Sequence, residues 1–360
     1  MAAQQAIEGL RELAGAGLTA ENVFRRADEL LRALLGYDAV CWHSADPATG
    51  LVTSVLSDDL SLMGFEDAVR LEVWADDPAT FPSIRRSGVR AETLSRATKG
   101  QLADSARFRE LIGPGGFGDE LRAVFDAHGG MWGCAAFMRS ADRGPYLARQ
   151  REFADLAARH LGNALRACHV PPAAGDVRRE AAEQGGPGEE SPAVVVLGPA
   201  NRPLAISGPA EELLGRLADP SRTSLGVPTA FAVAAEQARR VARGQVVPQS
   251  KIRVQDSAGR WYVLHGSALK GGSEGEVTVV AAPATPADAM PLYLSAYGLT
   301  AREQEVALLL VRGYDTRDVS RLLAMKPYTV QDHLKSVFAK AGVASRRELV
   351  ARIMLGGGTA

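Results

Sequence analysis

The chain has 360 residues, of which 46% are hydrophobic and 23% are charged, and this composition excludes both a single small module and a disordered polypeptide. No apolar run approaches the roughly 20 residues that cross a bilayer, and no basic-then-apolar leader opens the chain, so we expect neither a membrane span nor secretion. Cys41, Cys134 and Cys168 are too few and too dispersed for a disulfide framework or a thiolate zinc site, and they fit a reducing cytoplasm.

The net charge of −1 conceals an asymmetry along the chain. Residues 1–170 carry 19 Lys and Arg against 23 Asp and Glu, whereas residues 291–360 carry 10 against 6. A basic terminal domain on an otherwise acidic protein is typical of a phosphate-binding surface, although this excess of positive charge is small.

Two segments rich in proline and small residues divide the chain into three domains. Residues 170–192 contain almost no large apolar side chains, and residues 284–293 follow or contain several prolines, so both are predicted to be linkers. The domains are then residues 1–169, 193–283 and 294–360, and the fold class is α+β for the first two and all-α for the last.

The first two domains each alternate helical and strand patterns. Hydrophobic periodicity in the first domain predicts helices flanking an antiparallel sheet, at residues 7–35 (helix), 38–57 (hairpin), 102–111 (helix), 129–139 (strand) and 147–168 (helix). The middle domain is predicted to be a small sheet with helices on one face, built from strands at 193–197, 204–206, 251–254, 260–269 and 276–281 and helices at 211–217 and 229–243.

The last domain contains many residues that begin or end helices, and their spacing predicts four short helices. Thr300 and Glu303 form a capping box, Gly313 closes the helix that they open, and Asp315 caps the next. The third helix begins at Pro327 and ends before Gly342, and Ser345 and Glu348 form a second capping box that opens the fourth. 

The third of these helices has one apolar and one polar face. Its buried stripe is predicted to be Val330, Leu334, Val337, Phe338 and Ala341. A polar face that offers an amide, a carboxylate and an amine can enter a major groove, while cations at its rim meet phosphates. The alternative is the solvated face of an ordinary bundle. The predicted DNA-binding residues are Lys326, Tyr328, Thr329, Gln331, Asp332, His333, Lys335, Lys340 and Arg346.

The stretch from Gly298 to Ile353 resembles the helix-turn-helix domain of LuxR-type transcriptional regulators. The resemblance implies that Gln331, Asp332 and Lys335 reach bases, and that Thr329, His333 and Lys340 lie near the DNA backbone or support the recognition helix. Lys326 departs from the family, which has a capping Ser there. The matching positions are Leu299, Thr300, Arg302, Glu303, Glu305, Val306, Gly313, Val319, Leu323, Thr329, Val330, His333, Leu334, Lys340, Gly342, Val343, Ser345 and Arg346.

The preceding domains resemble sensor modules. Residues 18–168 are similar to a GAF-type α+β sandwich in the order of their elements, and residues 193–282 are similar to a PAS-type domain. Receiver and P-loop ATPase modules are not expected, because their motifs are missing from the sequence. The combination implies a cytoplasmic one-component regulator whose ligand or partner changes the geometry of a DNA-binding homodimer.

A ligand pocket is predicted on the central strands of the first domain. Cys41, Trp42, Trp132, Cys134 and Phe137 suit an apolar cavity, and the alternative is that they form ordinary core. His43 or His128 could join a cysteine as a metal ligand, but no tight spacing supports this, so neither a metal nor a cofactor is expected beyond an unidentified small molecule.

No catalytic constellation is evident, and no enzymatic activity is expected. Residues 113–118 spell G-x-G-x-x-G, but they follow a predicted helix and contain a proline, so we interpret them as a loop between helices and not as a dinucleotide site.

Two hypotheses remain at the level of the sequence. The first is a ligand-responsive transcription factor whose partners are double-stranded DNA, a second copy of the chain, a small-molecule effector and RNA polymerase. The alternative is a signalling or scaffold protein that binds partner proteins through its GAF-like and PAS-like domains.

Overall fold

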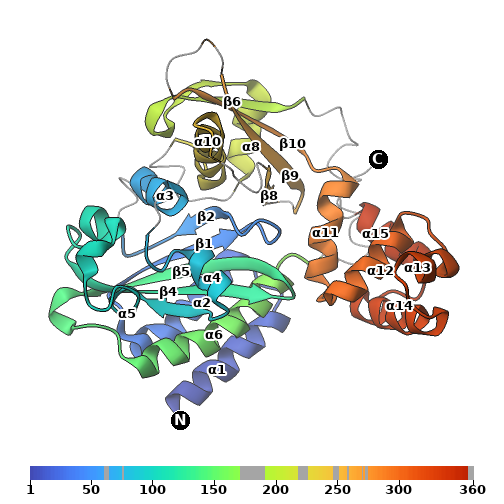
Figure 1. Ribbon diagram of the computed structural model, residues 1–360, viewed down its shortest axis with the longest axis horizontal. Helices are drawn as coiled ribbons and strands as arrows, with labels where there is room; N and C mark the ends of the chain where they lie inside the picture. Colours follow the sequence, from blue (N-terminus) through green and yellow to red (C-terminus); the bar gives the residue numbers. More distant parts are fainter. Residues whose placement is uncertain are drawn as a thin grey trace.

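The computed structural model places two antiparallel sheets and a group of C-terminal helices in three separate parts of the molecule (Figure 1). It describes residues 1–60, 65–74, 77–170, 191–217, 226–245, 251–257, 259–269, 271 and 275–355. Most of the predicted first linker, residues 170–192, therefore lies outside the described residues. The predicted mixed α+β architecture with a helical C-terminal part is confirmed.

The first sheet has the strand order β2-β1-β5-β4-β3, and all of its neighbouring strands are antiparallel. Helices α1, α2 and α6 cover one face, and α4 packs on the other. The strands are β1 Ala39–Ala45, β2 Val52–Leu56, β3 Ala91–Thr93, β4 Phe117–Ala127 and β5 Gly130–Ser140. The helices are α1 Ala2–Glu12, α2 Ala20–Leu31, α3 Phe65–Trp74, α4 Phe81–Ser87, α5 Leu94–Ala97 and α6 Ala148–Ala167.

Strand β4 follows a stretch whose structure differs from the prediction. Residues 102–111 form two short helical turns, Leu102–Asp104 and Phe108–Ile112, and not one continuous helix. The glycine-rich residues 113–118 then lead into β4, so the interpretation as a loop between helices is wrong. The hydrophobic pattern did not predict β4, because Asp119, Glu120 and Arg122 interrupt it, although all three are buried in the structure.

The second sheet repeats the same topology in the order β7-β6-β10-β9-β8, again antiparallel throughout. Helices α8 and α10 pack on one of its faces. The predicted strands and helices of this domain are confirmed to within a few residues. They are β6 Ala193–Leu197, β7 Pro203–Ile206, β8 Lys251–Gln255, β9 Trp261–Ala268, β10 Val277–Pro283, α8 Gly208–Arg216 and α10 Thr229–Ala242.

Helix α10 is buried on both sides because it lies between the two sheet domains (Figure 1). One side packs on β9 and β10 of its own sheet, and the other contacts α3 and β2 of the first domain. Its apolar residues accordingly surround the helix and do not form a single stripe. The approach to β9 is so close that a Cβ atom at Gly266 would lie 2.4 Å from the carbonyl oxygen of Ala234.

The predicted second linker, residues 284–293, is helical in the structure and forms most of α11 Pro286–Ala296. Thr285 caps this helix, since its Oγ1 accepts a hydrogen bond from the backbone N–H of Asp288 at 3.3 Å. Pro286 occupies the first turn, where a missing N–H costs nothing. Pro286 therefore marks a helix start, whereas Pro291 lies inside the helix. Leu292 and Tyr293 are buried against the rest of the C-terminal core.

The four predicted C-terminal helices are confirmed as α12 Ala301–Val311, α13 Thr316–Leu322, α14 Pro327–Ala341 and α15 Arg346–Leu355. None of the helices in the described part of the chain is long and apolar enough to cross a bilayer.

The end of α6 connects all three parts of the molecule. The His169 ring stacks between Trp132 of β5 and Trp261 of β9, with 5.4 Å between ring centroids on each side. Arg166 donates a hydrogen bond to the carbonyl of Ala296, the last residue of α11. The position of the C-terminal helices is thus tied to both sheets.

Replacement of Gly266 by Ala should destabilise the second domain by about 1–3 kcal/mol, because the added methyl forces β9 away from α10. Urea titration of the full chain measures the change. Ser267→Ala, on the exposed side of the same strand, is the matched control and should change stability by less than about 0.5 kcal/mol. Equal stability of the two variants would contradict the close packing.

Candidate nucleic-acid interface

Helix α14 presents the amphipathic arrangement that the sequence predicts. Val330, Val337 and Ala341 are buried, and Leu334 and Phe338 are half-buried against the same core. The helix begins at Pro327 and ends at Gly342, which has a left-handed backbone with φ of 63°. The apolar stripe therefore faces the domain, and the opposite face is turned to solvent.

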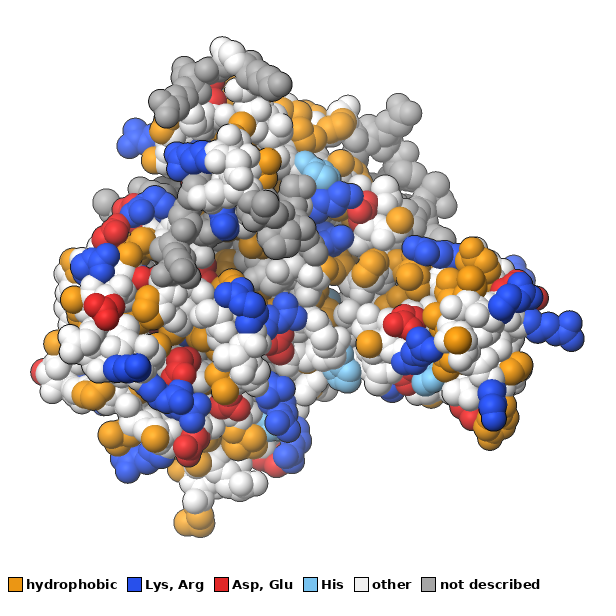
Figure 2. All heavy atoms as spheres, viewed as in Figure 1, with side chains coloured by type: hydrophobic (Ala, Val, Ile, Leu, Met, Phe, Trp, Pro, Cys, Tyr) orange, Lys and Arg blue, Asp and Glu red, His pale blue; other side chains and the backbone are white. Residues whose placement is uncertain are grey.

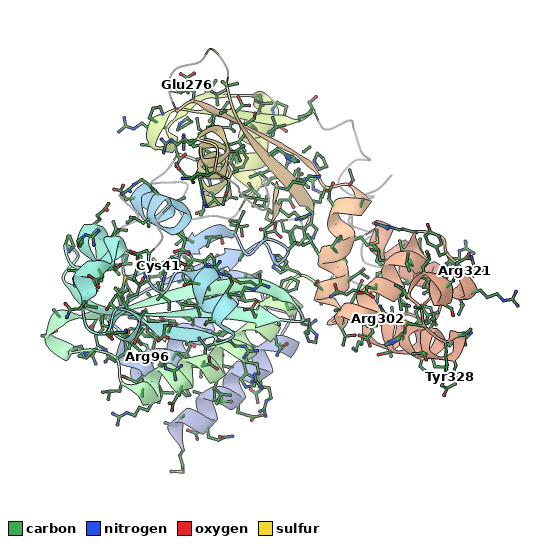
Figure 3. All side chains as sticks on the ribbon, viewed as in Figure 1. Cys41, Arg96, Glu276, Arg302, Arg321 and Tyr328 are labelled. Atoms are coloured by element: carbon green, nitrogen blue, oxygen red, sulfur yellow. The ribbon has the colours of Figure 1, made fainter. Side chains whose placement is uncertain are left out.

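The polar face of α14 is exposed. Tyr328 is 75% exposed and projects from the edge of the domain (Figure 3). Lys335 lies 3.4 Å from Asp332 through Nζ and Oδ1, and both side chains are largely in solvent. His333 is half-buried, so it supports the helix more than it faces outward. The remaining exposed members of the predicted set are Lys326, Thr329, Gln331 and Lys340.

Lys326 precedes the first turn of α14, and its side chain makes no capping hydrogen bond. A cation at this position faces the positive end of the helix dipole, which is unfavourable in the free protein. Its side chain is exposed and is available to a phosphate.

The first three helices meet in a small apolar core. Val306 of α12, Val319 of α13 and Val330 of α14 are each fully buried against one another. Asp315 caps α13 and accepts hydrogen bonds of 2.8 Å from the N–H groups of Arg317 and Asp318. This core fixes the angle between α13 and α14, which is the pair that docks on DNA in a helix-turn-helix.

A buried carboxylate holds α14 to α12. Glu303 Oε2 accepts hydrogen bonds from Lys340 Nζ and from the backbone N–H of Thr300, both at 2.7 Å, and its Oε1 accepts one of 2.6 Å from Ser336 Oγ. Burial alone would raise the pKa of this carboxyl, but the hydrogen bonds from Lys340, Ser336 and Thr300 outweigh it and lower the pKa to about 2. Lys340 therefore positions α14 through its bond to Glu303 of α12.

Arginines complete the framework of the domain. Arg346 donates a 2.8 Å hydrogen bond to the carbonyl of Leu310, which joins the start of α15 to the end of α12. Arg302 donates one of 2.7 Å to the carbonyl of Leu323 at the end of α13. Arg346, predicted to contact DNA, is half-buried in this structural role. The sequence could not show these contacts, because their partners are backbone carbonyls.

Lys and Arg side chains project from the outer edge of this domain in the space-filling view (Figure 2). Arg321 is among them, with a side chain that is 78% exposed, and it points away from the molecule (Figure 3). Cations thus surround the exposed polar face of α14, an arrangement that in DNA-binding proteins allows contacts with phosphates.

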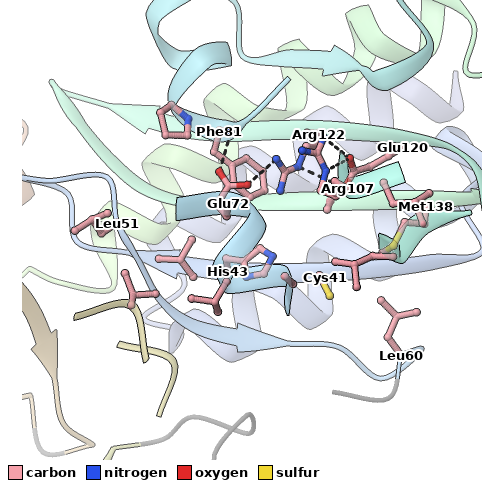
Figure 4. A pocket seen from close by; sticks show the side chains of 18 of the residues that line it. Cys41, His43, Leu51, Leu60, Glu72, Phe81, Arg107, Glu120, Arg122 and Met138 are labelled. Atoms are coloured by element: carbon pink, nitrogen blue, oxygen red, sulfur yellow. Dashed lines mark hydrogen bonds and ion pairs between the residues drawn. The ribbon is translucent and has the colours of Figure 1, made fainter. Parts of the chain in front are cut away.

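The predicted ligand pocket has a different lining in the structure. A cavity of about 420 Å³ lies on the face of the first sheet that α4 covers, and Cys41 is the one predicted residue that lines it (Figure 4). Trp42 and Phe137 belong to the core on the opposite face, because side chains alternate along β1 and β5. Trp132 is also core, and Cys134 is fully buried beside the cavity without lining it.

The cavity wall is uncharged at Cys41 and His43. Burial raises the pKa of the Cys41 thiol to about 12. Burial and the nearby Arg122 lower the pKa of His43 to about 3. Both side chains are therefore neutral near pH 7, and the described residues contain no group of three or more side chains that could hold a metal ion.

Residues 298–353 match the family model described as bacterial regulatory proteins of the luxR family. Two mycobacterial proteins named as HTH-type transcriptional regulators, Mb0914c of Mycobacterium bovis and MT0914 of Mycobacterium tuberculosis, are each 44% identical to this chain over 52 residues. That stretch is 14% of this chain, and the chain spans 6% of the length of these relatives. The C-terminal part is thus similar to the LuxR-type domain of bacterial regulatory proteins.

Two solved structures are similar to this chain, with low TM-scores. A phage VqmA–DPO complex gives a TM-score of 0.25 at 18% identity and covers 50% of this chain and 87% of that chain. A Vibrio cholerae VqmA dimer, described as a LuxR-type receptor, gives 0.21 at 18% identity and covers 49% and 85%. At these TM-scores the likeness supports no inference about ligand or assembly.

Replacement of Glu303 by Gln should loosen the contact between α12 and α14 by about 1–3 kcal/mol at pH 7, because the charge-assisted bond from Lys340 is lost. Since the folded pKa is depressed, the stabilisation is present above the ordinary glutamate pKa and disappears as the pH falls toward about 2. Hydrogen exchange in α12 and α14 at pH 7 and at pH 2 measures this.

The wild type and Glu303→Gln should therefore differ at pH 7 and converge at acid pH. Glu305→Gln is the matched control, because this carboxylate lies on the same helix but is 50% exposed. A constant difference between wild type and Glu303→Gln at all pH values would show that the carboxylate charge is not what holds the helices.

Proposed function

We propose that the protein is a sequence-specific transcription regulator that binds double-stranded DNA through α14. The observation that supports this most is the exposed polar face of α14 with Gln331, Asp332 and Lys335, held over a closed apolar core in a LuxR-type domain. Amide, carboxylate and amine groups on such a face match the donor and acceptor pattern of the major groove.

The regulator acts as a homodimer on a pseudo-palindromic site in this proposal. A single α14 reads too few base pairs to select one site in a genome, and two copies related by a two-fold axis read two half-sites. RNA polymerase is then the partner downstream of promoter binding.

The first two domains are proposed as GAF-like and PAS-like sensors of a small molecule or a partner. Contacts form a continuous route from the first domain to the DNA-binding helices: α10 packs on the first domain and on β9, and Trp261 and Val263 of β9 join the core that contains α11. Helix α11 leads directly into α12. A ligand that alters the packing of α10 can thus shift the orientation of α14.

The alternative is a scaffold protein whose terminal helices serve as a protein interface. Gel-shift titrations against promoter and random DNA at several salt concentrations separate the two, because only a DNA-binding protein shows salt-dependent retardation and a sequence preference.

Replacement of Lys335 by Ala should weaken binding to a site selected from random DNA by about 1–3 kcal/mol and relax preference at one base position, because the side chain is on the reading face. Fluorescence anisotropy on the selected site and its single-base variants measures this. Arg11→Ala, which removes an exposed cation from α1, is the charge-matched control. Unchanged base preference in Lys335→Ala would refute the assigned reading face.

Replacement of Lys326 by Ser should have two opposite effects. The serine hydroxyl can cap α14 and stabilise the domain by about 1 kcal/mol, while the loss of one phosphate contact lowers the salt dependence of DNA binding by about one unit of slope. Lys326→Ala is the control, because it should show the smaller slope without the gain in stability. An unchanged slope in both variants would remove Lys326 from the interface.

A further inference from the structure

The cavity on the first sheet is shared between two domains. Strands β1, β4 and β5 form one wall, and α10 of the second domain contributes Val233, Gln237 and Arg240. Its volume of about 420 Å³ is in the range of sites for small organic molecules. Most of the lining is apolar, with residues such as Leu51, Val69, Leu111, Phe117 and Met138.

The charged groups at the cavity already neutralise one another. Arg107 Nη1 lies 2.6 Å from Asp77 Oδ2, and Arg107 Nη2 lies 2.9 Å from Glu120 Oε2. Arg122 Nη1 lies 2.8 Å from Glu72 Oε2 (Figure 4). These two guanidinium groups face three carboxylates within the first domain, and Arg240 of α10 adds a third guanidinium to the lining, so that positive and negative groups are equal in number. A charged ligand would lose its hydration without gaining a free counter-charge, so the site favours an uncharged molecule.

Gln237 is an uncharged lining residue with an unmatched polar atom. Its side chain is 7% exposed, and its Oε1 is buried with no hydrogen-bond partner among the described residues. A buried amide oxygen without a partner costs about 1–3 kcal/mol, so such groups in native proteins usually face a ligand or a water. Gln237 lines the cavity from the α10 side, opposite the paired charges of β4.

The opposite wall of the cavity carries a hydrogen-bond donor, the guanidinium of Arg122. Arg122 is 6% exposed, and its contacts with Glu72, Glu120 and the carbonyl of Ala79 use Nη1 and Nε. Nε is buried and has no hydrogen-bond partner among the described residues, although it lies 3.4 Å from Glu120 Oε1. A ligand in the cavity therefore meets an unmatched amide at one wall and a guanidinium N–H group at the other.

We propose that this cavity binds an uncharged ring compound that carries an adjacent N–H and C=O pair, as in an amide or a lactam. The N–H donates to Gln237 Oε1 and the C=O accepts from the same carboxamide, while the ring fills the apolar lining. This inference deepens the proposed sensing function, because the ligand would bridge the first domain and α10 and so hold the two domains together.

Three probes of similar shape test the proposal by isothermal titration calorimetry on the full chain without DNA. Quinolin-2-one carries the lactam pair, quinoline lacks the N–H donor, and quinoline-2-carboxylate is an anion. We expect quinolin-2-one to bind at least tenfold more tightly than quinoline, and the carboxylate to bind least.

The decisive variant is Gln237→Met, which keeps the volume but removes the carboxamide. It should abolish the preference for quinolin-2-one while quinoline binds as before, and the free protein should be no less stable because an unmatched polar group is gone. Gln4→Met, at an exposed position of α1, is the matched control and should bind all three probes like the wild type.

A second variant, Val233→Phe, keeps the test decisive if Gln237→Met does not fold. The larger side chain enters the cavity from α10, so binding of quinolin-2-one and quinoline should be lost together.

Four results would each overturn the proposal: no binding of quinolin-2-one to the wild type, equal or tighter binding of the carboxylate, a preference that survives Gln237→Met, or binding that survives Val233→Phe. Because no DNA is present, a protein that binds its DNA site but fails these criteria refutes this inference alone, whereas loss of DNA binding in the gel-shift assay refutes the proposed function.

Discussion

The buried carboxylate of Glu303 is the contact on which the geometry of the C-terminal helices depends. It caps α12 at its N-terminus and accepts hydrogen bonds from Ser336 and Lys340 of α14, so one side chain fixes where one helix starts and how the other lies across it. The apolar contacts of Val306, Val319 and Val330 determine how close the helices come, but they are non-directional. The hydrogen bonds add the orientation that keeps the polar face of α14 outward.

A different constraint organises the rest of the molecule. Helix α10 is buried all around from Thr229 to Arg239, and most of these residues are apolar, so it is stable only if both of its flanks are covered. Its own sheet covers one flank and the first domain covers the other, so the two sheet domains cannot separate without exposing it. The stack of Trp132, His169 and Trp261 adds a second junction between them, near the point where Arg166 contacts the end of α11. The two sheet domains and the C-terminal helices are therefore mechanically connected.

The sequence predicted the elements whose signals are local. Thr300, Asp315, Pro327 and Gly342 mark helix ends through short-range hydrogen bonds and backbone preference, and these ends are where the structure has them. Features that depend on distant partners could not be predicted. The charged residues of β4 are typical of a surface segment, because the counter-ions that allow their burial lie in other segments. The prolines of residues 284–293 are typical of a linker, because the packing that makes α11 a helix depends on the tertiary core. The lining of the cavity was missed for the same reason, since strand alternation directs Trp42 and Phe137 to the opposite face.

Several positions that break local rules lie at the cavity. A buried strand rarely carries Glu120 and Arg122, and a helix packed between two domains rarely carries an amide without a partner, yet β4 and α10 bring these groups to one cavity. Such residues lower stability unless they serve another purpose, because an apolar replacement would avoid both the desolvation of the charges and the unmatched amide. They lie at the seam between the two domains, whereas Trp42 and Phe137 lie in the aromatic core on the opposite face of the sheet. The proposed ligand site thus uses the face of the first sheet on which charged and amide groups are already desolvated.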